Sequence, residues 1–172
     1  MSEEITIVTR EKQIALTISD VVGTMKLGKV MGPAYESIAA ELTKQGVQFG
    51  EGDIPFCKYS NLDWEQLSKK GIFSFINVMF FQKWHLEMGI PCPESAEGKD
   101  NIKKSELEAG CFVRAIHTGP YMKLKDTYEK VTTFAAENNL SFKDYSVEYY
   151  LNDPREISAD QLKTEVLVAI SN

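Results

Sequence analysis

Glu148 stands out because a carboxylate interrupts the run 146–151, which otherwise has the aromatic and aliphatic pattern of a β-strand. Side chains two apart along a strand share a face, so Glu148 and Tyr150 are expected to point the same way. Val147 and Tyr149 are then expected to point to the opposite face. A carboxylate among aromatic rings suits a delocalised organic cation, because each ring attracts a cation by about 0.5–2 kcal/mol.

Burial would change how this carboxylate titrates. A low-dielectric surrounding raises the pKa of an acid, and a bound cation lowers it again. Most glutamates in half-exposed strands are simply solvated, and from the residues alone this alternative for Glu148 stays open.

Seven strands and two helices are expected to position this residue. Strands are expected at 4–9, 12–19, 54–59, 84–90, 111–117, 146–151 and 164–170. A helix is expected to begin at Pro33 and end at Gly46, and a second to run from Tyr121 to about Asn138. Residues 61–81 fit a helix or a strand, and 91–104 is expected to be a linker.

The second half of the chain repeats the order of elements in the first. Gly119-Pro120-Tyr121 mirrors Gly32-Pro33-Ala34-Tyr35, and each is expected to open a helix. The strand at 147–151 mirrors 56–60, which sets Cys57 opposite Glu148 and Tyr59 opposite Tyr150. One domain is therefore expected over 1–172, with half-repeats of about 1–92 and 103–172.

Composition narrows the function classes. The 172 residues carry a formal net charge of −6, which argues against direct binding of nucleic acid. The most apolar run, 72–81, is too short to span a bilayer. No secretory signal is recognisable and the three cysteines are expected to be reduced, so a cytoplasmic location is expected. His85 and His117 lack a matching ligand set, and no metal or cofactor is expected.

The helix at 121–138 and the turn before it are expected to have structural roles. Tyr121, Leu124, Tyr128 and Phe134 recur at helical spacing and are expected to pack on the sheet. The charged residues of this helix are expected to form its solvent-exposed face. His117 is expected to satisfy backbone groups at the turn.

His117-Thr118-Gly119-Pro120-Tyr121, the helix after it, Glu148-Tyr149-Tyr150-Leu151-Asn152-Asp153-Pro154 and Thr164-Glu165 together resemble the GyrI-like family. That family includes the effector-binding domains of multidrug-responsive regulators. The resemblance implies an α+β fold of two pseudo-twofold-related β-α-β-β (SHS2-like) units, with a concave antiparallel sheet and helices on the other face. Glu148 matches the family's pocket glutamate and Tyr150 the motif's tyrosine, whereas Cys57 stands where the repeat would place a second acid.

The resemblance implies a stand-alone multidrug-type protein that captures lipophilic, cationic or planar aromatic compounds. No helix-turn-helix is recognisable before the first strands, so a complete one-chain transcription regulator is not expected. Residues 61–81 are expected to cover the pocket mouth. The expected ligand-binding residues are Glu148, Tyr150, Tyr59, Cys57, Trp84 and Phe80.

Two alternatives remain, although binding without catalysis is favoured. Some family members hydrolyse strained cyclopropane-bearing natural products, and here Glu148 would be the general base with Tyr150 or Tyr121 as hydrogen-bond donor. Gyrase-inhibiting members instead act on a protein partner, for which exposed acids such as Glu106, Glu108, Asp126 and Glu129 would be available.

Overall fold

A computed structural model describes residues 5–50, 52–68 and 81–171. Eight strands form one sheet in which every neighbouring pair is antiparallel. The strands are β1 (Thr6–Arg10), β2 (Gln13–Gly23), β3 (Phe56–Ser60), β4 (Lys83–Pro91), β5 (Lys103–Leu107), β6 (Gly110–Thr118), β7 (Phe142–Tyr150) and β8 (Lys163–Ile170).

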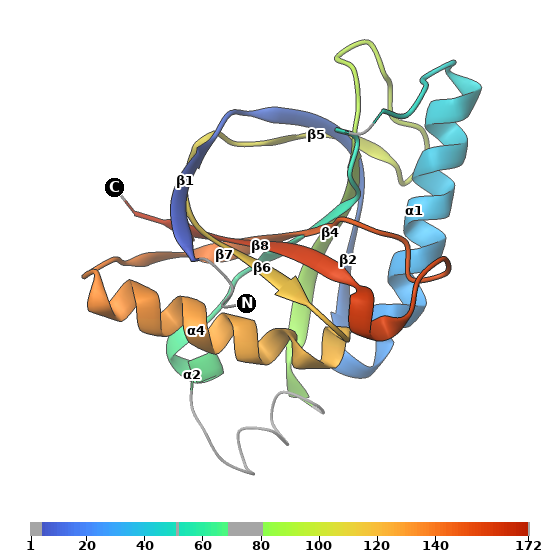
Figure 1. The fold of residues 1–172 in the computed structure, drawn as a ribbon. Coiled ribbons are helices and arrows are strands. Elements are labelled where there is room, and N and C mark those ends of the chain that lie inside the picture. Colours follow the sequence, from blue (N-terminus) through green and yellow to red (C-terminus); the bar gives the residue numbers. More distant parts are fainter. Residues whose placement is uncertain (1–4, 51, 69–80, 172) are drawn as a thin grey trace.

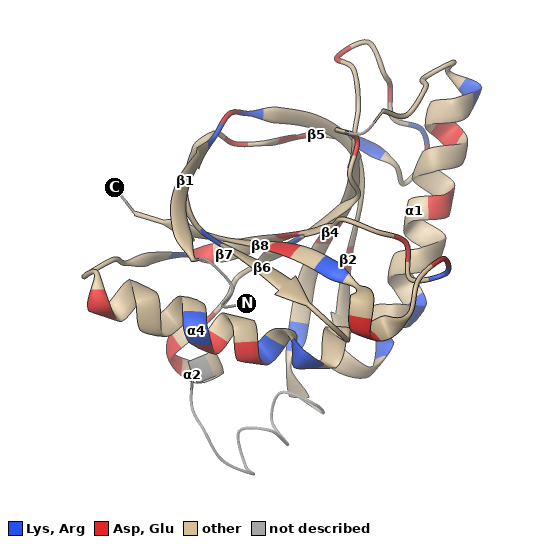
Figure 2. Cartoon of the chain, viewed as in Figure 1, with Lys and Arg blue, Asp and Glu red and all other residues tan. Residues whose placement is uncertain are grey.

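The helices lie on one face of this sheet, as Figure 1 shows. They are η1 (Thr24–Lys26), α1 (Leu27–Lys44), α2 (Trp64–Ser68), η3 (Tyr121–Lys123), α4 (Leu124–Glu137) and η4 (Ala159–Gln161). Figure 2 shows basic and acidic residues interspersed along α1 and α4. No helix in the described part of the chain is long and apolar enough to cross a membrane.

The strand order, β1-β6-β8-β7-β3-β4-β2-β5, reads the same from both ends when the two halves of the chain are exchanged. β7 and β3 meet at the centre, one from each half. The edge strands are exchanged, because β1 pairs with β6 of the second half and β5 pairs with β2 of the first. Each half therefore has the expected strand–helix–strand–strand order with one further strand at its start, and the α+β prediction is confirmed.

The sheet curls so that β1 and β5 arch over its concave face (Figure 1). The inside of the curl is filled by a buried cluster that includes Phe56, Phe112, Val147 and Leu167. A second apolar layer, with Val131 and Val166, lies between the sheet and α4. Because apolar layers cover both faces of the sheet at β8, this strand is buried on both sides. Its residues after Glu165 are accordingly all apolar and do not alternate with polar ones.

The first helix begins six residues earlier than predicted. Pro33 lies inside α1 rather than at its start. Interior proline costs about 3 kcal/mol or more, but Pro33 is exposed, and Leu27, Val30 and Met31 extend the apolar stripe that packs on the sheet. The counterpart of η3 is thus η1, not the Gly32-Pro33 turn.

β5 was not among the predicted strands, and the linker predicted at 91–104 overlaps its first two residues. Its sequence, Lys-Lys-Ser-Glu-Leu, has little apolar material, and charged side chains are common on edge strands because they discourage pairing between molecules. The loop before it has no regular strand or helix and agrees with the predicted linker. β7 also begins earlier than predicted, at Phe142, with an irregular register before Ser146.

Candidate functional site

Glu148 lies at the centre of the sheet, where β7 meets β3. Its register partners are Cys57 on β3 and Val166 on β8. Directly paired residues of neighbouring strands share a face, and Val166 packs against α4, so the carboxylate points to the helix-bearing side. The exposed fraction of Glu148 is 5%.

Tyrosine hydroxyls hold both carboxylate oxygens. Tyr128 of α4 donates to Oε1 at 2.8 Å, and Tyr150 donates to Oε2 at 3.0 Å. The Tyr128 hydroxyl also lies 3.1 Å from Ser146 Oγ, and the Tyr150 hydroxyl lies 3.4 Å from that of Tyr59. The acid is thus held by a network of neutral hydroxyl groups.

Burial governs the titration of this network. It raises the pKa of Glu148 above its ordinary value, and the hydrogen bonds from Tyr128 and Tyr150 oppose that rise. Burial, followed by the nearby carboxylate, raises the pKa of Tyr128, Tyr59 and Cys57. The tyrosines therefore stay protonated donors at neutral pH, and the Cys57 thiol stays uncharged.

Glu165, the other buried glutamate of these two strands, has a different environment. It forms ion pairs with Arg10, at 2.7 Å, and with Arg114. Its register partner is Tyr149, so it points to the concave face. None of the ion pairs found within residues 5–50, 52–68 and 81–171 includes Glu148. One buried glutamate is therefore matched by cations and the other is not.

Aromatic rings from four further elements surround the acid and its tyrosines. Tyr35 of α1 and Tyr121 of η3 both lie edge-on to the Tyr150 ring, with centroids at 6.2 and 5.7 Å. Trp84 of β4 lies edge-on to Tyr59 at 5.9 Å, and Trp64 of α2 lies 6.1 Å from Tyr128. Each of these four rings therefore lies within 6.2 Å, centroid to centroid, of a tyrosine of the site.

The structure brings most of the predicted site residues together. Cys57, Tyr59 and Tyr150 adjoin Glu148, and Trp84 lies behind Tyr59. Tyr121 reaches the cluster through the Tyr150 ring. Phe80 and most of the predicted cover segment lie outside the described residues, although the start of that segment, at Trp64, does pack beside the site. That these residues bind ligand stays a prediction.

Sequence reasoning missed the direct bond from Tyr128 to Glu148 and the part played by Tyr35. Both tyrosines lie on the sheet-facing stripe of a helix. Their hydroxyl groups could have indicated these roles, because a tyrosine that points into a core needs a hydrogen-bond partner there. Tyr35 donates to the carbonyl oxygen of Phe56 at 2.9 Å.

His117 fixes the turn that carries Tyr121. It is 3% exposed, with Nε2 at 3.2 Å from the carbonyl oxygen of Pro120 and Nδ1 at 2.9 Å from Thr127 Oγ1. The prediction that it satisfies a backbone group at the turn is confirmed. No group of three or more His, Cys, Asp or Glu in the described ranges is arranged to hold a metal ion.

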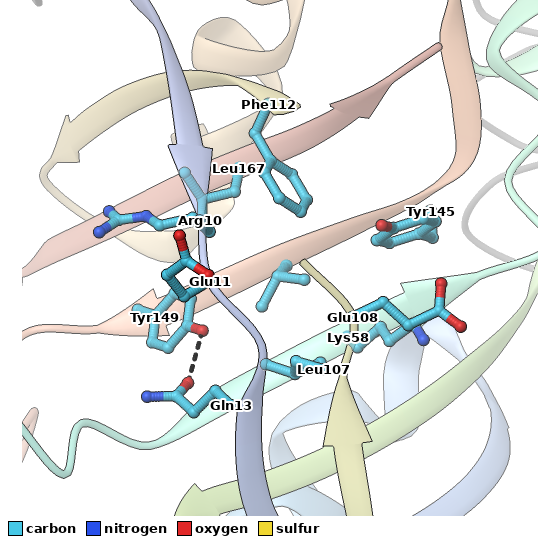
Figure 3. A pocket seen from close by; sticks show the side chains of 11 residues that line it. Arg10, Glu11, Gln13, Lys58, Leu107, Glu108, Phe112, Tyr145, Tyr149 and Leu167 are labelled. Atoms are coloured by element: carbon cyan, nitrogen blue, oxygen red, sulfur yellow. Dashed lines mark hydrogen bonds between the residues drawn. The ribbon is translucent and has the colours of Figure 1, made fainter. Parts of the chain in front are cut away.

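A small cavity lies on the concave face, and Figure 3 shows it from close by. Its volume is about 20 Å³, and Arg10, Lys58 and Tyr149 are among the side chains around it. Such a cavity has room for about one water molecule, whereas drug-sized ligands need roughly 300–1,000 Å³. This cavity therefore has no room for an organic ligand as it stands.

The family model for the GyrI-like small molecule binding domain matches residues 3–171. No curated protein sequence matches the chain at a significant level.

The chain is similar in structure to the EcmrR C-terminal domain, with a TM-score of 0.75, 16% identity and coverage of 100% of this chain and 99% of that one. In the EcmrR–DNA complex it matches with a TM-score of 0.73 and 16% identity, over 99% of this chain but 58% of the EcmrR chain.

Two further solved structures share the fold. A hydrolase from Listeria innocua has a TM-score of 0.67 and 14% identity, over 98% of this chain and 92% of that one. SAV2435 bound to tetraphenylphosphonium has a TM-score of 0.64 and 12% identity, over 98% and 94%.

Proposed function

The chain belongs to the GyrI-like small-molecule-binding family, and we propose that it captures lipophilic organic cations or planar aromatic compounds at Glu148, between α1 and α4. The observation that carries the proposal is a buried glutamate whose hydrogen-bond donors are neutral tyrosines. Within the described residues Glu148 has no cationic partner, and a buried carboxylate without one is unfavourable when ionised. A cationic ligand would supply the missing charge, as Arg10 and Arg114 do for Glu165.

The aromatic rings provide the remaining binding energy. A cation near the faces of Tyr59, Trp84 and Tyr150 would gain cation–π attraction, and an uncharged planar compound would gain stacking contacts. Tyr121 is the most exposed ring in contact with the cluster, at 38%. We propose that the ligand enters beside Tyr121, because turning this ring outward would expose less buried apolar surface than moving any of the other rings.

The ligand of one structural relative supports this chemistry by analogy. Tetraphenylphosphonium, which SAV2435 binds, is a lipophilic cation without hydrogen-bond donors. An aromatic site with one acid suits such a compound, since its delocalised charge is weakly hydrated and its rings match the tyrosine walls.

Two xanthene dyes of similar shape and opposite charge test the proposal. Fluorescence polarisation of the cation rhodamine 6G is expected to show micromolar binding, whereas the anion fluorescein is expected not to bind. Failure of both dyes to bind would contradict the proposed function. Equal binding of both would show aromatic capture without charge recognition.

A hydrolase of strained, cyclopropane-bearing electrophiles is the second candidate. An acid with a raised pKa beside two hydroxyl donors is an arrangement that general acid–base catalysis uses. Glu148 would accept a proton from the attacking water, and Tyr150 or Tyr121 would donate a hydrogen bond to the oxygen that gains charge as the ring opens. Mass spectrometry of such a substrate would detect the product as substrate plus one water. Loss of turnover with retained binding in Glu148→Gln would favour this candidate.

A further inference from the structure

Thr164 is a buried polar residue on the strand next to that of Glu148. It is the second residue of β8, and it pairs with Tyr150 of β7 on one side and with His117 of β6 on the other. Its register places it on the helix-bearing face, diagonal to Glu148 across two neighbouring strands. Its exposed fraction is 0%.

The Thr164 hydroxyl has no hydrogen-bond partner within the described part of the chain. The polar side-chain atoms of its two strand partners form hydrogen bonds to other residues. Both ring nitrogens of His117 are engaged, with Pro120 and Thr127, and the Tyr150 hydroxyl is directed to Glu148. Leaving a buried hydroxyl unpaired costs about 1–3 kcal/mol, and valine would fill the same space without that cost.

We infer that Thr164 is a second recognition point, which selects cationic ligands that also carry a hydrogen-bonding oxygen or nitrogen. This inference rests on the proposed function, because it extends the Glu148 site. Diagonal residues on adjacent strands lie roughly 7–8 Å apart, so one aromatic compound spans both points. The preferred ligand has a positive centre for Glu148 and a hydroxyl, ether or amine group at the other end of a ring for Thr164.

A matched set of phosphonium ions tests the inference. Tetraphenylphosphonium carries no hydrogen-bonding group, and its 3-hydroxyphenyl and 4-hydroxyphenyl analogues each add one oxygen at a different position. Calorimetric titration of the wild type is expected to show one hydroxylated isomer binding about fivefold more tightly than the parent ion, as one net hydrogen bond gives. In Thr164→Val this ratio is expected to fall to about one, while the affinity for the parent ion is unchanged.

Thr17→Val is the control variant. Thr17 is 2% exposed and lies on the concave face, where its hydroxyl is 3.5 Å from the carbonyl oxygen of Lys103. This variant is expected to keep the wild-type ratio. Thr164→Val is also expected to melt at or above the wild-type temperature without ligand, since it removes an unpaired polar atom.

The outcomes separate the two proposals. A ratio that persists in Thr164→Val, a wild type that does not prefer either hydroxylated isomer, or a large stability loss in Thr164→Val would each overturn the Thr164 inference. If all three ions still bind and Glu148→Gln weakens them, the proposed function stands and only the inference falls. If the wild type binds no phosphonium ion, both fall together.

Discussion

Replacing Glu148 by glutamine removes one charge from the candidate site with little change of shape. Glutamine retains an oxygen that can accept from one tyrosine, and its amide group can donate to the other hydroxyl oxygen. Burial raises the pKa of Glu148, so the carboxyl stabilises the fold when protonated, and this contribution is lost as the pH rises through the raised pKa. Glu148→Gln is therefore expected to keep or raise the melting temperature at neutral pH.

Ligand affinity is expected to fall in the same variant. A monovalent cation centred about 5 Å from the carboxylate is stabilised by about 3 kcal/mol at an effective dielectric constant near 20. Part of that energy is used to ionise a carboxyl whose pKa is raised. The net loss is expected to lie between tenfold and a hundredfold, or about 1.4–2.8 kcal/mol.

Rhodamine 6G titrations at neutral pH, followed by fluorescence polarisation, measure this loss. Glu106→Gln makes the same change of charge at an exposed site on β5 and is the matched control. Equal affinities of the wild type and Glu148→Gln, with both variants folded, would refute the assignment of Glu148 as the counter-charge. A lower melting temperature in Glu148→Gln would show that the carboxylate stabilises the ligand-free fold.

Three further predictions concern pH, the second glutamate and the turn. Because the pKa of Glu148 is raised, cation affinity is expected to increase with pH through that pKa and then to level off, and titrations of Glu148→Gln across pH are expected to be flat. Glu165→Gln leaves Arg10 and Arg114, both partly exposed, without their carboxylate, and urea unfolding is expected to show a loss of about 1 kcal/mol with unchanged dye affinity. Gly119 has a φ of +129°, so Gly119→Ala is expected to cost about 1–3 kcal/mol and to weaken dye binding by displacing η3, measured by melting and polarisation.

The central strands could be predicted from the sequence because their pattern is set by burial. β3, β4, β6 and β8 lie inside the sheet, where apolar residues recur at strand spacing between turns. The edge strand β5 could not, since an edge strand need not be apolar and pairs mainly through its backbone. Its existence depends on β2 offering a free edge, which is a property of the assembled sheet.

The start of α1 illustrates a second limit. A proline favours the first turn of a helix when nothing else competes. Here the apolar residues Leu27, Val30 and Met31 pack on the sheet, and that burial outweighs the interior position of Pro33. Comparison of the two halves gives the correct frame, because Met25-Lys26-Leu27 and Met122-Lys123-Leu124 both lead from a 3-10 turn into a helix.

The candidate site was predictable where it depends on strand alternation, and not where it depends on packing between elements. Alternation along β3 and β7 places Cys57, Tyr59, Glu148 and Tyr150 on one face. That Tyr128 donates to Glu148 depends on the rotation of α4 over the sheet, which helical spacing restricts but does not determine.

The pairing of Cys57 with Glu148 explains why the site has one charge. These residues occupy equivalent places in the two halves and lie directly opposite each other where β3 meets β7. Two buried carboxylates in these places would repel, and one of them would hold its proton. A buried thiol whose pKa is raised adds no charge at neutral pH. The cysteine therefore makes the centre of a nearly symmetric fold electrostatically asymmetric. Among the described residues the Glu148 carboxylate has no cationic partner, which suits the proposed binding of a monovalent cation.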